Sequence, residues 1–464
     1  MSQMQTENKM GTMGINKLLL SMSIPMMISM IVQALYNIVD TMFVSRLGQD
    51  ALTALSLAFP VQNLLIAVSV GTGVGVNAFL SRSLGEKNFK RANKVADNGV
   101  FLALLSSIIV MVLGFLAVKP YFKSFGSSDS VIALGTDYLS ICMIFSIGLF
   151  GQVMFEKLLQ STGKTVLSMV VQLLGAVINI ILDPILIYGM LFFPKMGVSG
   201  AALATVIGQI FSMILGFLIN AKFNTEISFS LKGCIIPDKD IIKRIYAVGI
   251  PSIVMASIGS VMTTCINQIM RIFDSATAAT GQAVFGIYFK LQSFVFMPVF
   301  GLNNGMVPIV AYNFGAKNKK RIVRTVTLSV IYACTIMLLG LVAFQLFPER
   351  LLGIFDTGGD DMKKIISLGI PMLRTISISF VLAGYCIVAG SVFQALGNGV
   401  LSLTVSVCRQ LVVLVPAAFI LSLTTRNINY IWYSFPIAEI ASIILSIIFM
   451  KRIFRTISSA MNND

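Results

Sequence analysis

Long apolar runs separated by short polar segments are the feature that most constrains this chain. A helix needs about 20 consecutive apolar residues to cross the core of a bilayer, and the sequence contains many such runs. Only 11% of its residues are charged, whereas soluble domains carry about 25%. We therefore predict an all-α polytopic membrane protein. Twelve spans are predicted, at residues 18–43, 52–80, 93–117, 131–158, 166–190, 197–221, 242–270, 281–311, 322–346, 365–393, 401–422 and 429–452.

Basic residues gather in alternate loops between these runs. The main groups lie at Lys87–Lys94, Lys222–Arg244 and Lys317–Arg324. Because cytoplasmic loops are enriched in Lys and Arg, we expect both termini to be cytoplasmic, in a multi-pass protein of the cell membrane. The polar start has no cleavage-site pattern, so we expect no cleaved signal peptide. The net charge of +15 follows from these loops and indicates no nucleic-acid partner.

The chain repeats itself. The segment GTGVGVNAFLSRSLGEKNFKRA, from Gly71, matches GLNNGMVPIVAYNFGAKNKKRI, from Gly301, at a constant offset of 230 residues. Since each half has six predicted helices, both halves begin on the same side, which makes a parallel repeat. We predict two homologous six-helix bundles, an N-lobe at 1–225 and a C-lobe at 226–464, joined by a basic linker at about 222–244.

Acidic residues inside the predicted spans are the strongest functional candidates. Asp40, Glu156, Asp183 and Glu439 lie there. Because an ionisable group at membrane depth is energetically costly, its presence there indicates a functional residue. The second half does not repeat the acids of the first, and near the position equivalent to Asp40 it has Asn267. No basic residue inside the spans of the first half is expected to pair with its acids, which favours function over structural ion pairing.

Two of these acids can belong to one oxygen-rich group. Asn179 and Asp183 share a helix face because they are four residues apart, and Ala201 and Thr205 are similarly one turn apart. Asp40 and Asp183 are expected at one depth. The side-chain oxygens of Asp40, Asn179, Asp183 and Thr205 would suit a proton or a sodium ion. Helix packing explains the small residues near Ala201 equally well.

The secondary candidates are less constrained. Glu156 is expected near the cytoplasmic side, as a solvated, gate-lining or binding group, with Gln160 one turn later. In the second half, Arg409 is expected either to pair with Glu439 or to reach the membrane surface, and Asn267 is the remaining polar candidate.

The chain resembles the multidrug and toxic compound extrusion (MATE) family over nearly its whole length. The motifs that carry the resemblance are YNIVDTMFVSRLG, GVGVNAFLSRSLGEKN, NIILDPILIYG, GVSGAALATVIG, FMPVFGLNNGMVPIVAYNFGAKN and FQALGNG. NIILDPILI, the acid before LLQSTG and the IAE motif are similar to the MepA-like multidrug exporters.

The resemblance implies a V-shaped rocker-switch transporter of two lobes. It implies a secondary antiporter that exports lipophilic cationic drugs in exchange for protons, or alternatively sodium, and confers drug resistance. The family's coupling positions map onto Asp40, Asn179, Asp183, Thr205 and the backbone of Ala201. Acids that some members carry in the second lobe are absent from helices 7, 8 and 10 here, which argues against sodium coupling in that lobe.

Other functions have weaker support. A flippase for anionic lipid-linked precursors would use basic cavity walls, for which Lys290, Arg374 and Arg409 are the candidates. An enzyme is disfavoured because the chain has no histidine for an HExxH site, no GxGD motif and no Walker loop. A channel or receptor fits the duplicated bundle poorly. We expect no cofactor, no firm metal site, contact with membrane lipid and a monomer.

Overall fold

The computed structural model describes residues 8–462, apart from 127, 191–192, 231–232 and 356–360. Within these residues the chain folds into helices and turns, without a strand. Ten helices are long and apolar enough to cross a membrane, and two bent helix pairs raise the number to twelve if each pair forms one span. The prediction of an all-α polytopic protein is confirmed.

The helices follow the predicted spans closely. The first half contains α1 (Lys9–Thr12), α2 (Ile15–Ser45), α3 (Gln49–Gly85), α4 (Phe89–Leu116), α5 (Val118–Lys123), α6 (Asp129–Ile144), α7 (Ile147–Ser161), α8 (Thr165–Tyr188) and α9 (Val198–Phe223). The second half contains α10 (Lys239–Met270), α11 (Ser275–Gly315), α12 (Lys319–Leu346), α13 (Pro348–Gly353), α14 (Asp361–Ser377), α15 (Phe380–Ala395), α16 (Gly399–Val407), α17 (Val415–Thr425) and α18 (Ser434–Asn462). A π-helical segment, Cys408–Leu414, joins α16 to α17, and a 3-10 helix, Ile428–Tyr433, precedes α18.

Three predicted spans are not the continuous α-helices that the sequence indicated. The span predicted at 131–158 bends by 45° between α6 and α7, and the span at 365–393 bends by 51° between α14 and α15. The span at 401–422 contains the π-helical segment. Serines explain the second bend, because Ser377 Oγ and Ser379 Oγ donate to the carbonyls of Arg374 and Ile376. Such bonds compete with the helical ladder and satisfy backbone groups that a membrane would leave without partners.

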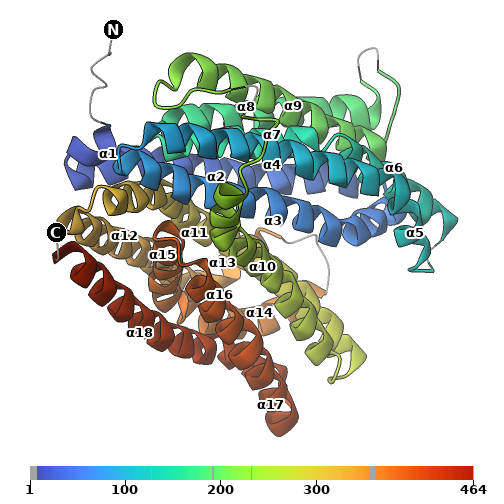
Figure 1. Cartoon of the computed structure of the whole chain (residues 1–464). Helices are drawn as coiled ribbons and strands as arrows, with labels where there is room; N and C mark the ends of the chain where they lie inside the picture. Colours follow the sequence, from blue (N-terminus) through green and yellow to red (C-terminus); the bar gives the residue numbers. More distant parts are fainter. Residues whose placement is uncertain (1–7, 127, 191–192, 231–232, 356–360, 463–464) are drawn as a thin grey trace.

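Two groups of helices make up the molecule (Figure 1). Helices α2 to α9 form the upper group in this view and α10 to α18 the lower group. The groups meet where α2 packs against α11 and α3 packs against α10 and α11. Helix α1 and the C-terminal end of α18 lie at the same end of the molecule.

The repeated glycines make this junction possible. A Cβ atom on Gly85 would lie 1.9 Å from the carbonyl oxygen of Tyr312, and one on Gly315 would lie 2.2 Å from that of Arg82. The ends of α3 and α11 therefore cross with backbone against backbone, which only glycine permits. The glycines shared by the two sequence repeats therefore allow the two lobes to pack closely against each other.

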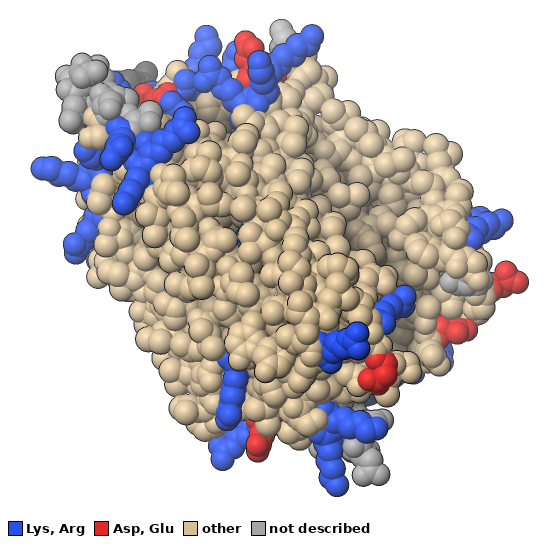
Figure 2. All heavy atoms as spheres, turned by 90° about the horizontal axis from the view of Figure 1, so that it is seen from below, with Lys and Arg blue, Asp and Glu red and all other residues tan. Residues whose placement is uncertain are grey.

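Charged residues lie mainly at the two ends of the helices. Figure 2 shows Lys and Arg side chains gathered at opposed margins of the molecule, with a broad band of uncharged residues between them. Large apolar side chains such as Leu116, Leu339 and Phe115 are more than 65% exposed on the surface. An exposed apolar band between polar ends is the surface expected of a protein embedded in lipid.

Candidate functional site

Three helices of the N-lobe bring the first group of polar residues together. Asn179 and Asp183 lie on one face of α8, which packs between α2 and α9. Helix α9 approaches α8 closely because Gly200 has no side chain: a Cβ there would lie 2.6 Å from the backbone of Leu186. The small residues of the α9 motif therefore do serve helix packing.

The contacts within this group agree with the predicted assembly. Asn179 Nδ2 donates to Thr205 Oγ1 at 3.0 Å. The carboxyl groups of Asp40, on α2, and Asp183, on α8, lie within hydrogen-bonding reach of each other. Asp183 is fully buried and Asn179 is 2% exposed. We call Asp40, Asn179, Asp183 and Thr205 the N-lobe polar cluster.

The N-lobe polar cluster has more acceptor oxygens than donors. Both oxygens of Asp183, Asp40 Oδ1 and Asn179 Oδ1 are buried and accept no hydrogen bond from the described part of the chain. Two carboxylates in contact repel each other unless a proton or a cation lies between them. Among the described residues, the cluster therefore has buried acceptor oxygens that a proton or a cation would satisfy.

Tyr36 is a member of this site that the sequence analysis missed. It lies one turn before Asp40 on α2, and its hydroxyl lies close to that of Thr205. The same i, i+4 spacing that identified Asn179 would have found it. Tyr138, on α6, is also close to Asp40, and its hydroxyl accepts a bond from Gln62 Nε2 at 2.9 Å.

Ala201 and Asp137 are two further residues of this lobe. Ala201 is buried one turn before Thr205 on α9, and it can offer only its backbone carbonyl because its side chain is a methyl group. Asp137 is an exposed acid on α6 inside the span predicted at 131–158, and the sequence analysis passed over it.

Glu156 and Gln160 belong to a separate group on α7. Glu156 Oε1 accepts from Gln152 Nε2 at 2.9 Å, and Gln160 Nε2 donates to Ser168 Oγ at 3.0 Å. Glu156 precedes the turn between α7 and α8 by about 8 residues, and Asp183 follows it by about 19. At 1.5 Å per residue they are roughly 16 Å apart along the helices, so Glu156 does not join the N-lobe polar cluster.

A buried basic residue lies inside a span of the first half, which was not expected. Lys157 is 6% exposed within α7. Its Nζ donates to Gln160 Oε1 at 2.9 Å and to Asn304 Oδ1, on α11, at 3.0 Å. The amide oxygens satisfy the ammonium group without neutralising it, and the bond to Asn304 joins the two lobes.

In the C-lobe the polar candidates are arranged differently. Arg409 Nη1 forms a salt bridge with Glu439 Oε1 at 2.6 Å, so the pairing considered for Arg409 is confirmed. Arg409 lies on the π-helical segment, a local distortion that is often found at functional sites. Asn267 lies three residues before the end of α10, and its backbone carbonyl accepts from Gln282. The second lobe thus has a neutralised charge pair in place of two facing acids.

Comparisons with known proteins identify the family. The MatE family model matches residues 25–185 and 255–420, which is more than half of the chain. The multidrug export protein MepA of Staphylococcus haemolyticus is 27% identical over 424 residues, 91% of this chain and 90% of that protein. The FAD transporter of Shewanella oneidensis is 26% identical over 407 residues, 87% of each chain.

Solved structures agree with this. A multidrug resistance MATE family transporter of the MOP superfamily, in its outward-facing conformation, has a TM-score of 0.90 and 25% identity, covering 99% of this chain and 100% of that one. A MOP superfamily transporter from Pyrococcus furiosus, described as having a binding pocket of reverse polarity, has a TM-score of 0.91 and 25% identity, covering 98% and 100%. The chain therefore belongs to the MatE family, the multidrug and toxic compound extrusion transporters.

Proposed function

We propose that this protein is a secondary active exporter that exchanges lipophilic organic cations for protons at the N-lobe polar cluster. The family and the relatives described as multidrug export proteins support export of several compounds. Many Met and Phe residues, 26 and 33 in the chain, suit a loose cavity that accepts varied shapes.

The contact between Asp40 and Asp183 carries the proposal. In an apolar lobe this pair is tolerated when a proton is shared between the carboxyl groups, because that removes one charge and makes a hydrogen bond. Loss of the proton leaves two adjacent negative charges, which a cation stabilises. Proton and cation therefore compete for one place, which is the requirement for exchange.

Sodium is the alternative coupling ion. Carboxylate, amide and hydroxyl oxygens are the ligands that hard cations prefer, and Asn179 Oδ1 and both Asp183 oxygens lack donors. Among the described residues no group of three or more His, Cys, Asp and Glu side chains lies together.

Export of an anionic compound is the second candidate. Lys157 supports it, because its buried Nζ donates to two neutral amide oxygens. A relative described as an FAD transporter is consistent with it. The pairing of Arg409 with Glu439 argues against it, since it removes the main basic candidate of the C-lobe.

Transport by purified protein in liposomes tests these alternatives. We expect efflux of a lipophilic cation such as tetraphenylphosphonium when a proton gradient is imposed, and little efflux under a sodium gradient of the same size. Efflux under sodium alone would replace the proton with sodium in this scheme. Transport of FAD but not of the cation would favour the anionic candidate.

The membrane orientation is part of the proposal. The basic end that carries α1 and the end of α18 would face the cytoplasm, as the positive-inside rule requires. A fluorescent reporter that matures only in the cytoplasm, fused after the last residue, should be bright in cells. A dark reporter on an inserted protein would reverse the orientation.

A further inference from the structure

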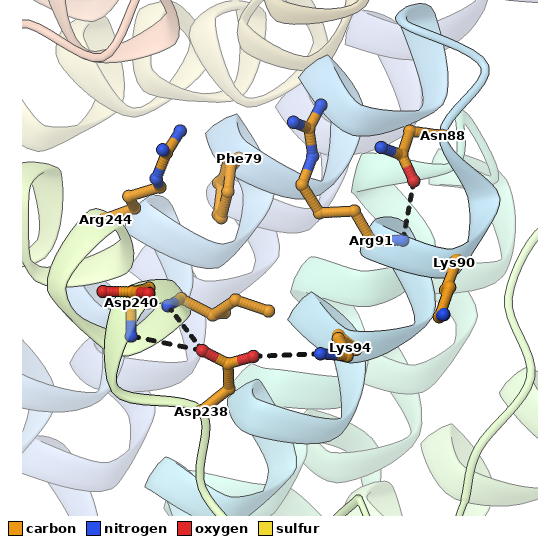
Figure 3. Close-up of a pocket in the computed structure, with 9 residues that line it drawn as sticks. Phe79, Asn88, Lys90, Arg91, Lys94, Asp238, Asp240 and Arg244 are labelled. Atoms are coloured by element: carbon orange, nitrogen blue, oxygen red, sulfur yellow. Dashed lines mark hydrogen bonds and ion pairs between the residues drawn. The ribbon is translucent and has the colours of Figure 1, made fainter.

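A basic pocket lies at the end of the molecule where α3, α4 and α10 meet, away from the N-lobe polar cluster. Its cavity volume is about 320 Å³. Four basic side chains line it, Lys90, Arg91, Lys94 and Arg244, together with the acids Asp238 and Asp240 (Figure 3). We call this cavity the basic pocket.

The acids neutralise only part of the basic pocket. Asp238 is paired with Lys94 at 3.1 Å. Arg91 is paired with Glu86, which Arg82 also contacts. Among the described residues, Lys90 and Arg244 form no salt bridge, and neither does Asp240. The four basic and two acidic side chains that line the pocket therefore leave a net charge of +2.

One aromatic ring orients the two guanidinium groups. Arg91 lies over Phe79 at 5.6 Å and Arg244 lies over the same ring at 5.8 Å. In Figure 3 the two arginines extend on either side of Phe79. Packing of this kind holds an arginine side chain in one place. Arg91 also donates to Ser83 Oγ and pairs with Glu86, whereas the N–H donors of Arg244 can meet a planar or tetrahedral anion.

The sequence repeat shows how the equivalent place is used in the other half. Arg321 corresponds to Arg91 at the offset of 230 residues. Arg321 Nη2 donates to the carbonyls of Met10 and Met13 at 3.0 and 2.7 Å. The backbone carbonyl oxygens of the segment before α2 therefore occupy the place around Arg321. The equivalent place around Arg91 is the basic pocket, an open cavity to which Arg244 adds a further positive charge.

We propose that the basic pocket binds a phosphate group, carried by the headgroup of an anionic phospholipid or by a soluble phosphate ester. Clusters of Lys and Arg beside a membrane attract anionic headgroups, and arginine forms paired hydrogen bonds with phosphate oxygens. Because Lys90 comes from the N-lobe and Arg244 from α10, a bound phosphate bridges the lobes. Its binding favours the conformation in which this end of the transporter is closed.

Binding to delipidated protein in neutral detergent tests the proposal. The probes are short-chain phosphatidylglycerol, phosphatidylcholine with the same chains, and glycerol phosphate. The double variant Lys90→Gln/Arg244→Gln should weaken phosphatidylglycerol binding about thirtyfold, since each basic residue near an anionic surface contributes about fivefold. Phosphatidylcholine, which has no net charge, should bind weakly to every variant.

The repeat supplies a matched control. Lys320 corresponds to Lys90, and Lys320→Gln/Arg324→Gln removes the same charge from exposed positions on the same end of the C-lobe. This control should bind phosphatidylglycerol within about threefold of wild type, because neither residue lines the basic pocket and salt screens exposed charges at a distance. Arg244→Lys in the Lys90 wild-type background should retain most of the binding, which guards against loss through misfolding.

The outcomes separate the two sources of phosphate. Strong phosphatidylglycerol binding with weak glycerol phosphate binding identifies lipid, and similar affinities identify a soluble ester. Equal weakening in the pocket variant and the control would overturn the proposal, because it would reduce the effect to general surface charge. Failure of both phosphate probes to bind the wild-type protein would overturn it as well.

Discussion

At the scale of single residues, a substitution of Asp183 tests the proposed exchange of cation for proton most directly. Asp183→Asn keeps the shape and removes the charge that attracts the cation. We expect tetraphenylphosphonium affinity to fall more than about tenfold, because truncating one partner of a buried charge interaction costs about 2 to 5 kcal/mol. Wild-type affinity should fall as pH drops, since protons compete for the pair, and the variant should lose this dependence.

Calorimetry at several pH values between about 5 and 8 checks this expectation. Carboxyl groups that transfer protons near neutral pH titrate in this range. Asp129→Asn is the matched control, because Asp129 is an exposed aspartate at the start of α6. It should behave as wild type. A wild-type affinity that does not change with pH would remove the proton from the site.

Lys157 is expected to contribute to stability through its bond across the lobes. Lys157→Met leaves Gln160 Oε1 and Asn304 Oδ1 without their donor, and hydrogen bonds to charged groups contribute about 1.5 to 3 kcal/mol. A double-mutant cycle of Lys157→Met with Asn304→Ala, measured on the free energy of unfolding, should give a coupling of about 1 kcal/mol or more. Strictly additive effects would mean that the contact does not stabilise this conformation.

The residues of the N-lobe polar cluster were predictable for a physical reason. Spacing of four residues places Asn179 and Asp183 on one helix face, whatever the tertiary fold. The burial of Lys157 was not predictable in this way, because it depends on α11 supplying Asn304 from more than a hundred residues away. The roles of these residues remain predictions.

At the scale of elements, the crossing of α3 and α11 depends on glycine. Gly315→Ala places a Cβ 2.2 Å from the backbone oxygen of Arg82, and a backbone atom cannot rotate away as a side chain can. Overpacking of this kind typically costs about 1 to 3 kcal/mol. Gly286→Ala is the control on the same helix, since a Cβ there meets nothing within 4 Å.

Thermal unfolding in detergent distinguishes the two glycines. We expect Gly315→Ala to lower the melting temperature and Gly286→Ala to leave it unchanged or raise it slightly, because alanine favours a helix by about 1 kcal/mol over glycine. Equal melting temperatures for both variants would show that the crossing tolerates a side chain.

The N-terminus of α10 is expected to weaken in acid. The bond from Lys94, with the backbone amides of Ile241 and Asp240, lowers the pKa of Asp238 below its ordinary value of 3.8. A carboxylate with a lowered pKa in the folded state stabilises the fold above its unfolded pKa, and this contribution is lost as pH falls through the folded value. The loss should begin near pH 4.

Asp238→Ala should cost about 1 kcal/mol near neutral pH, as expected for loss of a helix cap. Asp238→Asn keeps the cap and should cost less. The difference between wild type and either variant should shrink below about pH 4, because Asp238 is then protonated. Unfolding by denaturant at several pH values measures this, and a difference that persists into acid would contradict it.

The helix bends could not be predicted from the sequence. The spans at 131–158 and 365–393 are each long and apolar enough to be taken as one crossing, so composition gave no sign of a break. The second bend depends on Gln345 Nε2, on α12, which donates to the carbonyl of Arg374 and to Ser377 Oγ. Serine alone is common in straight helices, and its effect becomes visible only with the neighbouring helix in place.

At the scale of the whole molecule, the repeat predicted two lobes, and the lobes meet through pairs of helices from each half. Alternating access requires these lobes to move against each other. The side chains of Asn63, on α3, and Ser260, on α10, provide a place to test this, because Asn63 Nδ2 donates to Ser260 Oγ at 2.7 Å across the junction.

Joining these positions should stop transport. In the variant Asn63→Cys/Ser260→Cys, a short thiol-specific cross-linker ties α3 to α10 and holds the lobes in the present arrangement. We expect efflux from liposomes to fall to background after cross-linking and to recover when a reductant cleaves the linker. Each single-cysteine variant, treated in the same way, controls for reaction at the six native cysteines, which are free thiols. Because the linker leaves Asp40 and Asp183 untouched, cation binding should survive while transport is lost. Full efflux from the cross-linked protein would mean that this contact persists throughout the cycle, and the lobes would then have to open by bending within α3 or α10.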